Sequence, residues 1–88
     1  MKINKDFVSR NIAGDIILVP TGAASRKFNG MISLQGIGGF IWTCLGEGCD
    51  KETILNRIMA EYEVAEDVAR ADLDDFIGEM LKRGILEE

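Results

Sequence analysis

Two cysteines and a short run of acids are the side chains of this sequence that could carry chemistry. Cys44 and Cys49 lie five positions apart, and four acids follow on one predicted helix: Asp72, Asp74, Asp75 and Glu79. A thiol nucleophile or a carboxylic acid needs a base beside it, and the sequence has no histidine, the commonest base and the commonest metal ligand. We therefore predict no catalytic residue, no metal site and no cofactor, and the protein is not expected to be an enzyme.

Both groups have a structural interpretation. Two cysteines without a third cysteine or a histidine nearby form neither a zinc site nor a disulfide framework, so free thiols are predicted. The acids are typical of a solvated helix face. The start of the sequence lacks the apolar core of a signal peptide, and no stretch reaches the roughly 20 apolar residues of a membrane helix. We therefore expect a cytoplasmic protein without membrane contact.

Composition and charge narrow the class further. The length of 88 residues allows one domain, residues 1–88, and 47% hydrophobic residues with a single proline predict a compact fold. The net charge of −5 is divided unevenly: residues 1–44 carry five positive and two negative charges, and residues 45–88 carry five positive and thirteen negative charges. Because an acidic half repels phosphate, nucleic acid is not an expected partner.

The first third of the sequence predicts three strands. Phe7–Ile12 and the β-branched run Ile16–Val19 flank the turn signal at residues 13–15, which is typical of a hairpin. A third strand is expected at Phe28–Leu34, where Phe28, Ile32 and Leu34 share one side of the pleat with Gly30 between them. These runs predict an antiparallel meander.

Three helices are expected after the strands, each with an apolar stripe of helical period. The stripes are Ile37, Phe40, Ile41, Cys44 and Leu45; then Ile54, Leu55, Ile58, Met59 and Tyr62 after Asp50 as N-cap; then Ala69, Leu73, Phe76, Ile77 and Met80. The third helix should run from Glu66 to Arg83 and stop at Gly84, with Ile85 and Leu86 folding back onto the core. Trp42 and Tyr62 are predicted as partial core. The order indicates an α+β fold, a three-stranded antiparallel sheet followed by a three-helix bundle.

The third strand could also bind another chain. If it lies at the edge of the sheet, its outward N–H and C=O groups have no partner, and such an edge either aggregates or accepts an added strand. Lys27, Asn29 and Gly30 protect it only mildly. Two alternatives stay open, because the third helix or a second copy in a homodimer could cover the edge.

The order of four segments resembles the PqqD-like family. These segments are Ile16–Pro20, Met31–Trp42, Ala71–Ile77 and Leu81–Leu86, so the resemblance covers nearly the whole chain. The strand ending in proline, the Ser-Leu-x-x-x-Gly-x-x-Ile-Trp stretch and the Asp-Leu-x-x-Phe-Ile-x-x-x-Leu ending carry it together. Members are small modules, also called recognition elements for ribosomally made, post-translationally modified peptides (RiPPs).

The resemblance implies a winged helix-turn-helix-like fold and a function without chemistry. Family members bind the leader of a precursor peptide and present its core to a modifying enzyme, often a radical S-adenosylmethionine (radical SAM) enzyme. The leader is implied to add as a strand to the third strand and to lie between it and the third helix. Carried onto this sequence, the expected peptide-binding residues are Phe28, Asn29, Gly30, Met31, Ile32 and Ser33 on the strand and Asp72, Asp75, Phe76 and Glu79 on the helix.

The sequence departs from members devoted to pyrroloquinoline quinone synthesis. Those tend to carry Leu-Asp or Leu-Asn after the third strand and an Asp-Gly pair with a following Thr between the first two helices. Here Leu34 is followed by Gln35, and the link reads Gly46-Glu47-Gly48-Cys49-Asp50. These departures favour a different peptide product.

Two other classes of function are alternatives to peptide recognition. A DNA-binding winged helix would need a basic third helix, whereas residues 66–83 carry six acids and three bases. A dimeric scaffold without a peptide ligand would pair the third strand with its own copy and leave no free edge.

Overall fold

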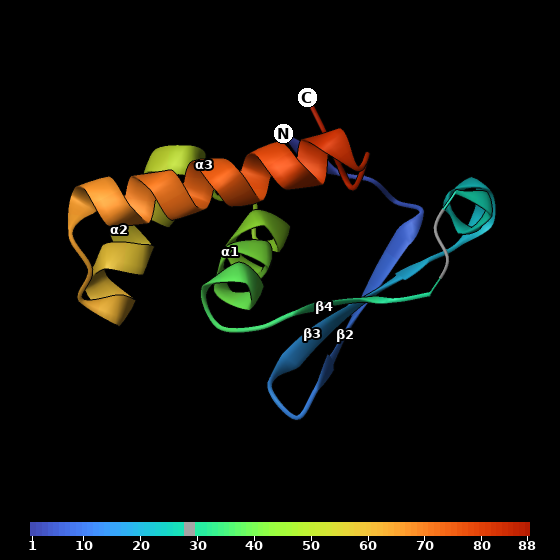
Figure 1. Cartoon of the computed structure of the whole chain (residues 1–88), viewed down its shortest axis with the longest axis horizontal. Coiled ribbons are helices and arrows are strands. Elements are labelled where there is room, and N and C mark those ends of the chain that lie inside the picture. Colours follow the sequence, from blue (N-terminus) through green and yellow to red (C-terminus); the bar gives the residue numbers. More distant parts are fainter. Residues whose placement is uncertain (28–29) are drawn as a thin grey trace.

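The first half of the chain folds into a three-stranded antiparallel sheet. The computed structural model describes residues 1–27 and 30–88 (Figure 1). The strands β2 (Phe7–Ile12), β3 (Asp15–Pro20) and β4 (Ile32–Leu34) pair in the order β2-β3-β4. The hairpin turns tightly because Ala13 (φ 53°) and Gly14 (φ 90°) both adopt positive φ, and the Asn11 side-chain oxygen accepts a hydrogen bond from the Gly14 N–H at 3.2 Å.

The register of the strands fixes which side chains face the core. Ile16 lies opposite Leu34, and Leu18 lies opposite Ile32, so these four residues share the face that the helices cover. The alternate positions Val8, Arg10, Ile17, Val19 and Ser33 form the outer face.

Three helices follow, as the sequence predicted: α1 (Ile37–Gly46), α2 (Lys51–Tyr62) and α3 (Glu66–Lys82). The predicted N-cap of α2 is confirmed, because an Asp50 side-chain oxygen accepts a hydrogen bond from the Thr53 N–H at 2.8 Å. The predicted stripes of α2 and α3 are confirmed except at Tyr62: Ile54, Leu55, Ile58, Ala69, Leu73, Ile77 and Met80 are buried, and Met59 and Phe76 are partly buried. Tyr62 is 37% exposed, and its ring meets the Phe40 ring edge-on with 5.5 Å between the ring centroids.

Helix α1 lies between α3 and the sheet (Figure 1). A Cβ on Gly39 would stand 3.3 Å from Ile16 Cγ1 and 3.4 Å from the backbone oxygen of Leu34, so the helix touches the sheet through a residue without a side chain. Because neighbours surround α1, it buries more than one stripe. Trp42 lies outside the predicted apolar stripe of α1 and was predicted as partial core. It is only 5% exposed and belongs to the core.

The end of the chain returns to its beginning. Gly84 (φ 76°) ends α3, and the Ile85 N–H donates to the Met80 oxygen at 2.9 Å. Ile85 and Leu86 are buried, as predicted, and β5 (Leu86–Glu87) pairs with β1 (Lys2–Ile3) in a separate two-stranded sheet. This small sheet and the 3₁₀ helix η1 (Gly22–Arg26) were not predicted, because two-residue strands and a five-residue turn have no periodic signal.

The third strand is shorter than predicted. Of the expected segment Phe28–Leu34, β4 comprises only Ile32–Leu34. Gly30 has φ 91°, which is incompatible with extended backbone, and Met31 is 70% exposed outside the strand. Phe28 and Asn29 lie outside the described residues.

Two glycines should respond oppositely to alanine. Gly78 lies inside α3 with nothing within 4 Å of an added Cβ, so Gly78→Ala should raise the free energy of unfolding by about 0.5–1 kcal/mol. Gly39→Ala should lower it by about 1–3 kcal/mol, since the new methyl group presses α1 off the sheet. Urea unfolding of both variants checks this; equal stabilisation would show that the contact at Gly39 relaxes freely.

Candidate functional site

One edge of β4 has no strand partner among the described residues. β4 pairs with β3 alone there, and alternate residues of an edge strand point their N–H and C=O groups away from the sheet. Either Ser33 or the pair Ile32 and Leu34 therefore presents free backbone groups. Ile32 is partly buried on the core face, and Ser33 is exposed on the outer face. Such an edge can accept another strand.

The start of α1 connects this edge to one flank of α3. Gly39 touches the backbone of Leu34, and an added Cβ on Gly38 would stand 3.5 Å from the Phe76 ring. At Gly38 and Gly39, helix α1 therefore adds little side-chain bulk between β4 and α3. We name Ile32, Ile37, Gly38 and Phe76, all partly buried, the α3–β4 surface.

The predicted helix residues do not all point to this surface. Asp72, Phe76, Glu79 and Arg83 follow at steps of four, three and four residues, so they share one flank of α3. Asp75 stands two residues after the buried Leu73, a rotation of about 200°, and so faces away from the core. The structure thus brings Asp72, Phe76 and Glu79 to one flank and leaves Asp75 on the solvent side.

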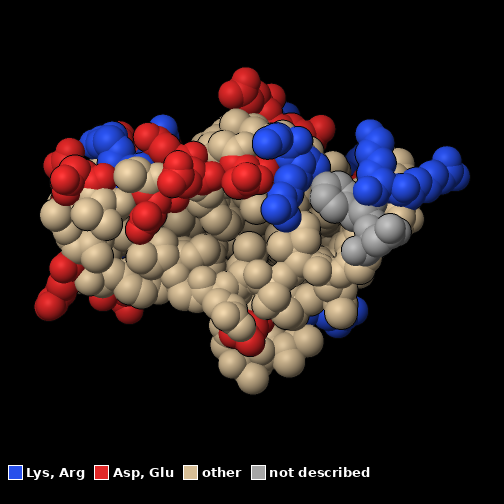
Figure 2. Space-filling model, viewed as in Figure 1, with Lys and Arg blue, Asp and Glu red and all other residues tan. Residues whose placement is uncertain are grey.

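Charge is distributed unevenly along that flank. Figure 2 shows acidic side chains over α3, basic ones over its C-terminal end and over η1, and uncharged surface below the acidic row. Glu79 pairs with Arg83 at 3.4 Å, and Asp74 pairs with Lys51. Within the described part of the chain, Asp72 forms no ion pair, so its carboxylate is available to a ligand.

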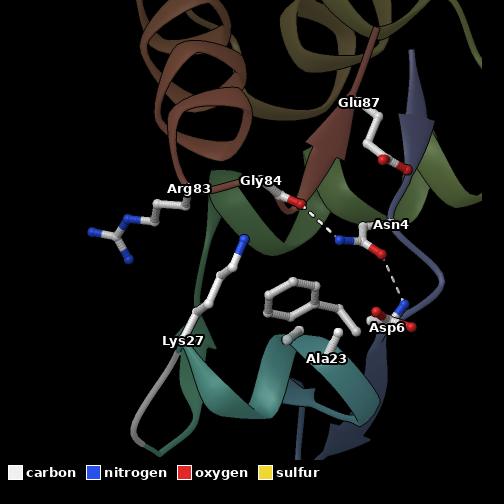
Figure 3. A pocket seen from close by; sticks show the side chains of 9 residues that line it. Asn4, Asp6, Ala23, Lys27, Arg83, Gly84 and Glu87 are labelled. Atoms are coloured by element: carbon white, nitrogen blue, oxygen red, sulfur yellow. Dashed lines mark hydrogen bonds between the residues drawn. The ribbon is translucent and has the colours of Figure 1, made fainter.

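A hollow lies beyond the end of α3. It has a volume of about 260 Å³ and is lined by Asn4, Asp6, Phe7, Ala23, Ala24, Lys27, Arg83, Gly84 and Glu87. In Figure 3, Lys27 extends from the end of η1 toward Gly84, and Asn4 donates a hydrogen bond to the Gly84 oxygen at 2.9 Å. The Asp6 N–H in turn donates to the Asn4 side-chain oxygen at 2.9 Å. Sequence reasoning did not find this hollow, because its residues come from segments far apart in the chain.

The cysteines are placed as structural residues. Cys44 is 3% exposed, and burial raises the pKa of its thiol. A hydrogen bond from Arg57 Nη1 to Cys44 Sγ, at 3.9 Å, partly opposes this rise. Cys49 is half-buried, and neither cysteine forms a disulfide. In residues 1–27 and 30–88, no three His, Cys, Asp or Glu side chains are grouped to hold a metal ion.

Comparison with known proteins agrees with this geometry. The profile of the family described as Coenzyme PQQ synthesis protein D (PqqD) matches residues 15–86. The chain belongs to the PqqD family. No protein of curated function matches it in sequence. None of the described helices is long and apolar enough to cross a membrane.

A solved member of this structural class is a peptide complex. The structure "TbiB1 in Complex with the TbiA(beta) Leader Peptide" matches with a TM-score of 0.87 and 31% sequence identity, over 99% of this chain and 95% of the TbiB1 chain. The similarity to a PqqD-like fold expected from the sequence is therefore confirmed.

The two cysteines should react at different rates. At neutral pH, iodoacetamide should label Cys49 at least tenfold faster than Cys44, because a buried thiol with a raised pKa is protonated and shielded. Mass spectrometry of the folded and the urea-unfolded protein measures this, with Cys49→Ser isolating the Cys44 signal. Equal rates in the folded protein would contradict the burial of Cys44.

Proposed function

We propose that this chain is a non-catalytic module that captures the leader of a ribosomally made precursor peptide. The leader adds as a strand to the free edge of β4 and lies on the α3–β4 surface. The observation that carries the proposal is the unpartnered edge of β4 beside an uncharged surface, within the described residues. Membership of the PqqD family and the similarity to TbiB1, solved with a leader peptide, support it.

The short edge limits what main-chain bonds can supply. A three-residue strand offers one or two outward residues, hence about two to four hydrogen bonds, which contribute about 1–6 kcal/mol in total. Micromolar binding needs about 8 kcal/mol. Side-chain contacts on the α3–β4 surface must therefore supply much of the affinity, with Ile32 and Phe76 as the apolar contacts. Met31, exposed just before β4, can extend them.

We also propose a partner enzyme and a place of action for this module. The module, residues 1–88, presents the leader's core segment to a modifying enzyme, for which a radical SAM enzyme is our candidate. It acts in the cytoplasm, where the precursor is synthesised. The departures from the quinone-synthesis members point to another peptide product.

The DNA-binding class is less compatible with the structure, and the dimeric scaffold has a direct test. Helix α3, in the position of a recognition helix, carries six acids and two bases between Glu66 and Lys82, which repels a phosphate backbone. A strand-paired homodimer would use the same β4 edge, or the edge of β2. Sedimentation at micromolar concentration distinguishes it, since it requires a dimer in the absence of peptide.

Addition of the leader to β4 can be tested by following backbone amide signals in NMR spectra. A leader peptide of a precursor encoded beside this gene should shift the NMR amide signals of Ile32–Leu34, while those of β2, the other edge, stay in place. One of the two variants Ile32→Pro and Ser33→Pro removes an N–H that points outward from β4. That variant should weaken binding at least tenfold while the protein stays folded by circular dichroism. Shifts confined to β2, or unchanged affinity in both folded variants, would contradict addition at β4.

The free carboxylate on α3 provides a second test. Asp72→Lys should weaken a leader with basic residues about twofold to fivefold at low salt, as expected for an exposed charge pair. Glu61→Lys, an equal charge change on the exposed side of α2, is the matched control. If calorimetry finds the same affinity for both variants, Asp72 does not contact the leader.

A further inference from the structure

The hollow beyond α3 has a cationic side and an anionic side. Lys27 and Arg83 lie on one side in Figure 3, and Asp6 and Glu87 lie on the other with Asn4. Lys27 is exposed and forms no ion pair with any described residue, whereas Arg83 pairs with Glu79 at 3.4 Å. The ammonium group of Lys27 is therefore the charge on this side that is free to bind a ligand.

The cationic side adjoins the α3–β4 surface. Arg83 continues the flank of Asp72, Phe76 and Glu79, and Lys27 stands on the segment that leads toward β4. In Figure 1, α3 and β4 run roughly parallel across the molecule with α1 between them, and η1 lies beyond the C-terminal end of α3. A strand added to β4 that extends past Met31 would therefore pass Lys27.

Spacing along α3 sets spacing in the peptide. Asp72 and Arg83 are eleven residues apart, which is about 16 Å along a helix. An extended peptide covers that distance in about five residues. Arg83 marks the level of Lys27, since both line the same side of the hollow. Successive side chains of a strand point to opposite sides, so two peptide residues that both face α3 are an even number of positions apart. The even numbers nearest to five are four and six.

We propose that Lys27 and the adjoining hollow form a subsite for a carboxylate side chain of the bound peptide, so that the module selects peptides with two opposite charges. The acidic residue of the peptide lies at Lys27, and a basic residue four or six positions away lies at Asp72. The inference rests on the proposed leader binding and adds the charge pattern of the leader. The side formed by Ala23 and Ala24 can hold the methylene groups of the acidic residue, and Asp6 and Glu87 lie across the hollow from Lys27.

Peptide display tests the pattern without knowledge of the natural precursor. A library of random twelve-residue peptides is selected against the full-length protein, against Lys27→Glu and against Arg10→Glu. Arg10→Glu is the matched control, since it makes the same charge change on the outer face of the sheet. We expect wild-type binders to carry Asp or Glu four or six positions from Lys or Arg. Only Lys27→Glu should lose the preference for the acid.

A charge exchange then tests the contact itself. Replacing the acid of a selected peptide by lysine should weaken its binding to the wild-type protein about threefold to tenfold at low salt, and Lys27→Glu should restore it. Lys27 also stands near the C-terminal end of α3, where a cation stabilises the helix. A purely structural role would lower the thermal midpoint of Lys27→Glu but would not produce restoration by the exchanged peptide.

The outcomes separate the two proposals. Selected peptides that shift the Ile32–Leu34 amides without any preference for an acid overturn the carboxylate subsite and leave leader binding intact. A preference for an acid that persists unchanged in Lys27→Glu also overturns it. Selection that yields no peptide competing at β4 contradicts both.

Discussion

The close contact between α1 and the sheet at Gly39 is the constraint on which the rest of the structure depends. Because Gly39 has a hydrogen in place of a side chain, α1 comes near enough to the sheet for Ile16 and the Leu34 backbone to contact it. Gly38, one residue earlier, leaves room for the Phe76 ring on the other side. Two adjacent glycines thereby set the distance from β4 to α3. Glycine disfavours a helix interior, so packing against the sheet and α3 must offset that cost.

The proposed function follows from this arrangement because it requires position rather than reactivity. A strand edge offers hydrogen bonds that any peptide can make, and selectivity must come from side chains beside it. In our proposal those side chains are apolar at Ile32 and Phe76 and charged at Asp72 and Lys27. A module of this kind needs no histidine, metal or activated thiol, which agrees with the composition of the sequence and with the burial of Cys44.

Helical periodicity made most of the fold predictable. The stripes of α2 and α3, the Asp50 cap and the Gly84 stop each depend on neighbours within a few residues, and local sequence encodes them. The length of β4 was overestimated because the positive φ of Gly30 depends on the path of the whole loop. The candidate site was predictable only in part. The choice of the third strand and the third helix came from the resemblance to the PqqD-like family, and helical period then placed Asp72, Phe76 and Glu79 on one flank. The hollow joins the N-terminal segment, η1 and the end of α3, which no local pattern connects.

The pairing of β1 with β5 has a consequence for protein engineering. It holds Lys2 opposite Glu87, so the first and last described residues emerge side by side (Figure 1). A short linker could join them, and the chain could then be opened at the tip of the β2–β3 hairpin, where Ala13 and Gly14 are exposed. Such a circular permutant would keep β4, α1 and α3 in one unbroken segment. It could be inserted into a loop of a host protein without moving the surface that we assign to the peptide.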